Sequence, residues 1–143
     1  MLTYQQAGHE DIEAIYLLNK ENMDLYEDLD SLDYDFVLDY LYHDIEQAIA
    51  QYQVIYQNNI KVGYYCLHED ENEIELVDLY ILKDFRHQGL GTQVLNKIIQ
   101  EASKPISLYA FSQNKRAIDM YLNHGFTIAE RLGPTRIKLK RTL

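Results

Sequence analysis

Residues 85–91, with the sequence FRHQGLG, contain the clearest candidate for a binding loop in the chain. An apolar segment precedes this stretch and an amphipathic one follows it, and two of the chain's six glycines stand two positions apart within it. A strand, a turn and a helix in this order leave free backbone N–H groups at a positive helix end. Glycine removes the Cβ that would keep an anion away. The stretch therefore predicts a phosphate-binding loop, with a plain glycine-rich turn as the alternative.

Two other kinds of phosphate loop do not fit the sequence. A Walker loop requires GxxxxGK[ST], and a dinucleotide-binding fingerprint requires GxGxxG with an acidic residue further along. Neither pattern is present. The spacing Arg-x-x-Gly-x-Gly is short enough to occur by chance, so its place between a strand and a helix is what gives it weight.

The composition favours one packed domain over residues 1–143. Hydrophobic residues make up 47% of the 143 positions, which is ample for one core. No apolar run is long enough to cross a membrane, and the N-terminal segment lacks the pattern of a signal peptide. The single cysteine, Cys66, lies in an apolar run, which predicts a buried thiol and a reducing, cytoplasmic location.

The charge of the chain is divided between its two halves. The net charge of −10 argues against nucleic acid as a partner. Residues 1–82 hold 2 Lys/Arg against 19 Asp/Glu, whereas residues 83–143 hold 11 against 4. The first part, at −17, could attract a cation, and the second, at +7, could hold an anion.

Hydrophobic periodicity and turn residues predict an α/β fold that positions this loop. The expected order is β-α-α-β-β-β-α-β-α-β-β, a mixed, mostly antiparallel sheet of about seven strands flanked by four helices. Strands are expected over 2–7, 52–57, 60–68, 73–82, 105–111, 126–131 and 135–141, and helices over 9–21, 33–51, 90–102 and 114–125.

Two motifs at compatible spacing resemble the GNAT superfamily of N-acetyltransferases. LYILKDFRHQGLG is similar to its acetyl-CoA signature, [QR]-x-x-G-x-[GA] after an apolar strand. NKRAIDMYLNHGF fits its N-x-x-A-x-x-x-Y-x-x-x-G-F pattern from Asn114 to Phe126. The expected element order agrees with that fold along nearly the whole chain, except over 20–50, where the superfamily varies. Lys83 stands where many relatives carry proline, a departure that concerns only the turn.

The resemblance implies acetyl-CoA as the acyl donor. Backbone groups at Leu79 and Ile81 would then hold the pantetheine arm, and the Ile81 N–H would polarise the thioester carbonyl. Asn114 would contact the pantetheine, although its place at a helix start also fits an N-cap. The residues implied to wrap the pyrophosphate, mainly through backbone amides, are Arg86, His87, Gln88, Gly89, Leu90, Gly91 and Thr92.

Acetyl transfer to an amine needs a base and an acid. A primary amine is mostly protonated at neutral pH, so a group or a water molecule must take its proton. Glu73, Glu75 and Asp78 lie on the appropriate strand, and Glu75 stands at the spacing from Arg86 at which the histone-acetylating branch carries its glutamate base. A single bulge would decide which of them points into the cleft. Tyr121 is the acid that the resemblance implies for the departing thiolate, with packing in the core as the alternative.

The amine acceptor is left open by the sequence. The five histidines show no ligand spacing, and Cys66 has no evident histidine partner, so we expect neither a metal nor a covalent intermediate. Residues 21–46 carry ten acidic residues and no Lys or Arg, which suggests an aminoglycoside, a polyamine or a peptide amine as acceptor. A solvated acidic surface explains the same residues. An acyl-CoA sensor and a nucleotide-binding regulator are rival functions, and a homodimer is compatible with the sequence.

Overall fold

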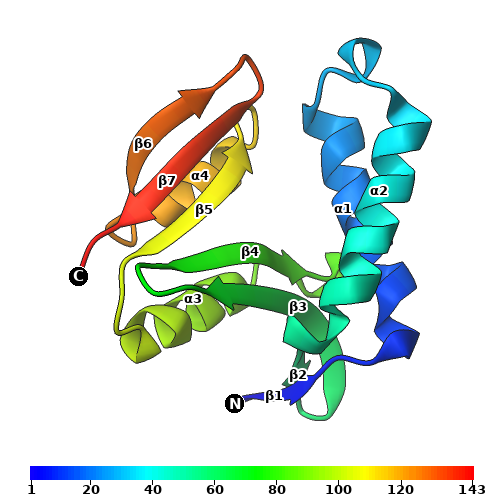
Figure 1. Ribbon diagram of the computed structural model, residues 1–143. Helices are drawn as coiled ribbons and strands as arrows, with labels where there is room; N and C mark the ends of the chain where they lie inside the picture. The colour runs from blue at the N-terminus through cyan, green and yellow to red at the C-terminus, as the bar shows by residue number, and fades with distance from the viewer.

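The computed structural model describes all residues, 1–143, and confirms the predicted order of elements (Figure 1). The strands are β1 (Leu2–Gln6), β2 (Tyr52–Gln57), β3 (Ile60–Glu69), β4 (Ile74–Ile81), β5 (Ile106–Phe111), β6 (Thr127–Leu132) and β7 (Arg136–Arg141). The helices are α1 (Ile12–Tyr26), α2 (Tyr34–Ala48), α3 (Leu90–Glu101) and α4 (Lys115–Leu122).

One seven-stranded sheet runs through the molecule in the order β1-β2-β3-β4-β5-β7-β6. Every neighbouring pair is antiparallel except β4 and β5, which are parallel. Short turns join β2 to β3, β3 to β4 and β6 to β7. Asn58 and Asn59 both adopt positive φ between β2 and β3, as a two-residue hairpin requires. The crossover from β4 to β5 passes through α3, which places the glycine-containing turn at the end of β4.

Two hydrophobic layers sandwich the sheet. Apolar residues of α3, led by Leu90, Val94 and Leu95, pack on one face in a cluster that also takes in α4. Ile15 of α1 and Ile45 of α2 pack on the other face, against β2 and β3. The amphipathic stripe predicted for α3 therefore matches its buried face, whereas in α2 only Ile45 of the predicted stripe is fully buried and Tyr40 is exposed.

The boundaries of three helices differ from the sequence prediction. α1 begins after a 3-10 turn at residues 9–11 and continues to Tyr26, into acid-rich sequence without clear periodicity. α2 ends at Ala48, and residues 49–51 form a 3-10 turn. α4 ends at Leu122, where Gly125, at φ +87, helps to close the helix as predicted.

No helix of the structure is both long enough and apolar enough to span a bilayer.

Candidate active site

The turn between β4 and α3 presents a row of backbone N–H groups that bond to nothing in the protein. α3 begins at Leu90, and its N-cap, Gly89, lies at φ +79 and has no side chain to cap the helix. The first N–H to find a partner is that of Gln93, which donates to the Gly89 carbonyl at 3.1 Å. The N–H groups of residues 87–92 are therefore free, and His87, at φ +65, adds a second left-handed residue. Such a run forms an anion-binding concavity.

The side chains of this loop leave its backbone N–H groups accessible. His87 and Gln88 are exposed, and Leu90 is buried in the core. Arg86 donates through Nε to the Ile81 carbonyl at 2.8 Å, and its Nη1 lies 3.6 Å from Oε1 of Glu21. The guanidinium thus ties the loop to β4 and α1, which agrees with the expectation that the backbone provides most of the binding groups.

A second cation stands beside the loop. Arg116, at the start of α4, contacts the His87 ring, with Nη1 at 3.0 Å from Nε2. Sequence reasoning passed over this residue, although it lies two positions after Asn114 in the second motif. It contributes to the positive charge of the C-terminal half at the place where an anion would bind.

β4 and β5 separate immediately beyond the start of their pairing. They pair only at Ile74 with Ile106 and at Glu75 with Ser107, after which β5 turns away from β4 (Figure 1). The Leu82 N–H donates to the Val62 carbonyl of β3 at 2.8 Å. Because backbone groups alternate along a strand, those of Leu79 and Ile81 face the open side. The structure thus leaves the Leu79 backbone groups and the Ile81 N–H free for a ligand in the gap, whereas the Ile81 carbonyl already accepts from Arg86.

A cleft with a volume of about 380 Å³ lies in this gap. Its floor is formed by residues 75–80 of β4, one wall by α1 and α2, and the other by β5, α4 and Arg136 of β7. Of the residues predicted for the site, Glu75, Leu79, Asn114 and Tyr121 all line it. The structure thus brings these residues of the two motifs together.

A β-bulge brings two acidic residues into the cleft from one strand. Cys66 of β3 pairs with Asp78, but the next residue, Leu67, pairs with Leu76, so Val77 is the extra residue. The bulge reverses the alternation of side chains. Glu75 and Asp78, three positions apart, consequently both line the cleft.

Asp78 is held in a network of polar side chains. Tyr52 donates its hydroxyl to Oδ2 of Asp78, and Asn19 of α1 donates to the same oxygen at 3.2 Å. Burial raises the pKa of Asp78 to about 6 despite these hydrogen bonds, and the charges of Asp44 and Glu75 add to the effect. At neutral pH the carboxylate is mostly ionised, which makes Asp78 a candidate base.

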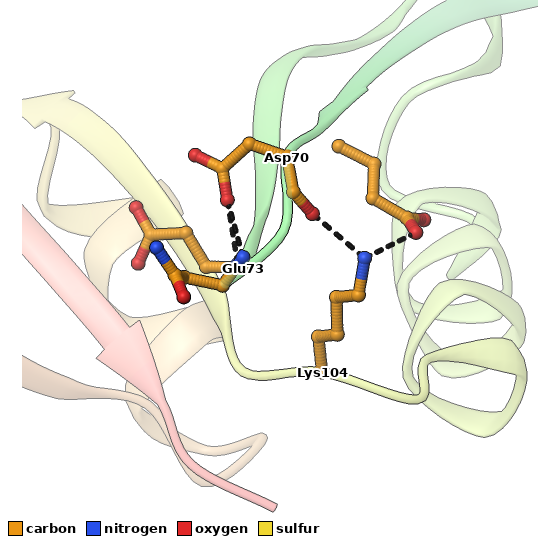
Figure 2. Close-up of polar contacts among 5 residues, drawn as sticks. Asp70, Glu73 and Lys104 are labelled. Atoms are coloured by element: carbon orange, nitrogen blue, oxygen red, sulfur yellow. Dashed lines mark hydrogen bonds and ion pairs between the residues drawn. The ribbon is translucent and has the colours of Figure 1, made fainter.

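Glu73 and Glu75 have different surroundings. Glu73 immediately precedes β4, at the end of a turn in which Asp70 accepts hydrogen bonds from the backbone and Lys104 donates to the Asp70 carbonyl (Figure 2). The Glu73 carboxylate accepts from Ser107 at 3.1 Å and lies 3.4 Å from Nζ of Lys140. Glu75 has no such partner, and no unpaired side-chain oxygen is sealed from solvent. Its carboxylate is therefore free in the cleft.

Tyr121 combines a packed ring with an accessible hydroxyl. The residue is only 7% exposed, and its ring meets that of Phe126 edge-on at 5.5 Å between centroids. Burial, with the charge of Asp78, raises the pKa of the hydroxyl well above its ordinary value. The hydroxyl has no protein partner and is not sealed, so it opens to the cleft as a protonated group. Asn114 caps α4 by accepting from the Ala117 N–H at 3.3 Å, as its position predicted.

Residues 12–126 match the family model described as "Acetyltransferase (GNAT) family". The chain belongs to this family. Among curated proteins, N-alpha-acetyltransferase 50 of Danio rerio is 30% identical over 101 residues, which cover 64% of this chain and 60% of that protein. The probable N-acetyltransferase san of Drosophila melanogaster is also 30% identical over 101 residues, covering 64% of this chain and 55% of that protein. The chain thus matches less than two thirds of the length of either relative.

Solved structures confirm the GNAT fold. The PaiA N-acetyltransferase of Thermoplasma acidophilum, in complex with coenzyme A, superposes with a TM-score of 0.74 at 16% identity, covering 100% of this chain and 99% of that one. Naa50 of Arabidopsis thaliana, in complex with the bisubstrate analogue CoA-Ac-MVNAL, superposes with a TM-score of 0.67 at 20% identity, covering 99% of each chain.

The acidic segment of this GNAT protein, residues 21–46, forms only a small part of the cleft lining. Of the ten acidic residues between positions 21 and 46, only Asp44 is among the cleft residues. Asp28 and Asp33 accept hydrogen bonds from backbone N–H groups at helix starts, and Asp24 pairs with Lys20. The acidic region thus contributes only Asp44 to the cleft, and the other nine acidic residues lie outside it, which agrees better with the alternative of a solvated acidic surface.

Five cleft residues in the C-terminal half were not singled out from the sequence. They are Leu108, Tyr109, Ala110 and Phe111 of β5 and Arg136 of β7. The alternation of side chains in PISLYAF places Tyr109 and Phe111 on the same face of a strand. It does not reveal which face of that strand is open to the cleft. Cys66, in contrast, is 1% exposed as predicted, and burial raises the pKa of its thiol to about 12, which makes it a poor nucleophile.

Proposed function

We propose that the protein is an N-acetyltransferase that transfers an acetyl group from acetyl-CoA to a primary amine by direct attack in a ternary complex. The observation that carries this proposal is the cleft at the separation of β4 and β5. In this cleft, backbone groups of β4 that suit an extended ligand lie together with the free carboxylate of Glu75 and the hydroxyl of Tyr121. Membership of the family and the CoA complexes of its structural neighbours support the same activity.

The residues present fit coenzyme A. The free N–H groups of residues 87–92 suit a pyrophosphate, and an added Cβ at Gly89 would project into open space where an anion would lie. Leu79 and Ile81 offer backbone groups to the pantetheine arm, and Asn114 lines the same cleft. When bound, acetyl-CoA supplies an acetyl thioester whose C–S bond breaks as the C–N bond to the amine forms.

Glu75 and Tyr121 are the groups we assign to proton transfer. Glu75 takes one proton from the amine, directly or through a water molecule, because its carboxylate has no competing partner in the protein. Tyr121 donates one proton to the departing thiolate and regains one from solvent, and Glu75 releases the proton that it took. The count then balances for the neutral amine, and an ammonium acceptor first loses one further proton to solvent. Asp78 is the alternative base, and we do not assign Glu73 because Ser107 and Lys140 engage its carboxylate.

The acceptor we propose is the N-terminal amine of a peptide. The bisubstrate analogue in the Arabidopsis thaliana neighbour carries the peptide MVNAL, and the name of the Danio rerio relative specifies N-alpha-acetylation. The buried cysteine supports a cytoplasmic location for this activity, in a single domain over residues 1–143.

A thiol-release assay with acetyl-CoA tests the function. The panel contains peptides with a free N-terminus and peptides with a blocked N-terminus whose only amine is a lysine side chain. A polyamine and an aminoglycoside complete it. We expect release of CoA with free N-terminal peptides. Acetyl-CoA binding by calorimetry without release from any amine would instead identify a sensor, and competition by ATP at similar affinity would identify a nucleotide-binding regulator.

A further inference from the structure

The open face of β5 and β7 carries aromatic and basic side chains in register. Tyr109 pairs with Lys138 and Phe111 with Arg136 across the two strands. Nζ of Lys138 lies 5.7 Å from the Tyr109 ring centroid, and Cζ of Arg136 lies 4.7 Å from that of Phe111. The intervening Ile137 is 2% exposed, so Arg136 and Lys138 point to the face opposite the core. We call these four residues the basic–aromatic strip.

The strip continues the wall of the acceptor cleft. Tyr109, Phe111 and Arg136 line the cleft whose floor and opposite wall contain Glu75, Asp78 and Asp44. Figure 1 shows α4 behind β5 and β7, and α1 and α2 across the gap from these strands. The acidic side chains thus lie on the floor and opposite wall of the cleft, and Arg136 and Lys138 lie on the β7 side.

The two cations of the strip differ in their partners. Nε of Arg136 lies 3.4 Å from Oε2 of Glu27, at the end of α1. The neighbouring Lys140 pairs with Glu73. Lys138 stands opposite Glu130 of β6 in the register but forms no ion pair with a carboxylate within 4 Å, and its Nζ lies over the Tyr109 ring. An aromatic ring attracts a cation without cancelling its charge, so Lys138 remains able to bind an anion.

We infer that the acceptor peptide carries an acidic side chain at its second, third or fourth position, bound by Lys138 with Arg136 beside it. This inference rests on the proposed function. Ser107, which pairs with Glu75, lies about 7 Å along β5 from Tyr109, the partner of Lys138, and about 13 Å from Phe111, the partner of Arg136. An extended peptide covers these distances in about two to four residues. The α-amine then lies at the acidic end of the cleft and the acidic side chain at the strip.

A polycationic acceptor fits this cleft poorly. Its first ammonium group would meet Glu75 and Asp78, but its remaining charges would meet the like charges of Arg136 and Lys138. Like-charge contacts reject a partner more strongly than rim ion pairs favour one. The cleft is thus expected to prefer a peptide with an acidic side chain to a polyamine, although both acceptors have an amine that could be acetylated.

The test compares three peptides of equal length that begin with alanine and carry two Glu, two Gln or two Lys residues at positions 2 and 3, with spermidine as the polycation. We expect kcat/KM for the Glu peptide to exceed that for the Gln peptide by roughly three- to tenfold at low salt, and the Lys peptide to be the poorest. The advantage should decline at high salt, because exposed charges are screened.

Two substitutions assign the effect to the strip. Lys138→Gln should reduce the preference for the Glu peptide to near parity while leaving the rate with the Gln peptide unchanged, and Lys138→Glu should invert it. The matched control is Arg131→Gln: Arg131 is exposed on the same hairpin but pairs with the inward-facing Ile137, so the same charge is lost on the opposite face. Circular dichroism checks that each variant folds.

The inference is overturned if the Gln peptide, the Lys peptide or spermidine is preferred, or if Lys138→Gln and Arg131→Gln change the preference equally. Failure of the proposed function would give a different result, because no amine would then cause release of thiol from acetyl-CoA. That result would also overturn the inference.

Discussion

Glu75 and Glu73 are the same residue type on one strand, yet only Glu75 is free to act. Glu75→Gln should lower kcat/KM at about pH 7 by roughly 10²- to 10⁴-fold, the usual contribution of a general base. The loss should shrink at alkaline pH, where more of the amine is already deprotonated. Glu73→Gln is the matched control and should leave the pH–rate profile unchanged. A normal profile for Glu75→Gln would transfer the base role to Asp78 or to water.

Tyr121 tests whether a packed residue also takes part in chemistry. Tyr121→Phe keeps the ring against Phe126 and removes a hydroxyl that has no protein partner. We expect turnover to fall by roughly tenfold or more, with acetyl-CoA affinity measured by calorimetry and the melting temperature nearly unchanged. Unchanged turnover would leave Tyr121 as a core residue only.

Asp78 links the cleft to stability. Its pKa is raised from 3.8 to about 6 in the folded protein, so between these values the folded state holds a proton that the unfolded chain releases. The contribution of Asp78 to the free energy of unfolding should therefore fall as pH rises from about 4 to about 6, by up to about 3 kcal/mol. In denaturant titrations Asp78→Asn should lack this component. An equal pH dependence in both proteins would contradict it.

At the scale of elements, the sequence predicted most of what the local pattern determines. The stripe Leu90, Val94, Leu95 and Ile98 recurs at helical spacing, and α3 ends within one residue of its predicted boundary. The bulge at Val77 was foreseen only as an alternative, because side-chain alternation alone does not reveal where a strand gains a residue. The cleft wall of Tyr109, Phe111 and Arg136 depends on how far β5 separates from β4, which is a tertiary property.

The turn before α3 can be tested with a glycine pair. Gly89 and Gly133 both have positive φ, +79 and +68, and an added Cβ at either would meet no atom within 4 Å. Gly89→Ala and Gly133→Ala should each destabilise the fold by about 1 kcal/mol, the cost of an L-residue in this conformation. Only Gly89→Ala should weaken CoA binding in calorimetry, because only its backbone belongs to the phosphate loop. Equal CoA affinities would contradict that assignment.

The whole molecule has a net charge of −10 and is nevertheless expected to bind a polyanion. Local charge resolves this conflict, because the loop of residues 87–92 and Arg116 belong to the part of the chain with charge +7. Coulombic attraction of this kind is screened by salt, whereas backbone contacts to the pantetheine are not. Raising the salt from about 0.05 to 0.5 M should therefore raise the Kd of CoA several-fold. Acetyl-pantetheine, which lacks the phosphates, should bind with a nearly constant Kd. If both ligands responded alike, or if the Kd of CoA did not change, the charge division of the chain would have no part in holding the cofactor.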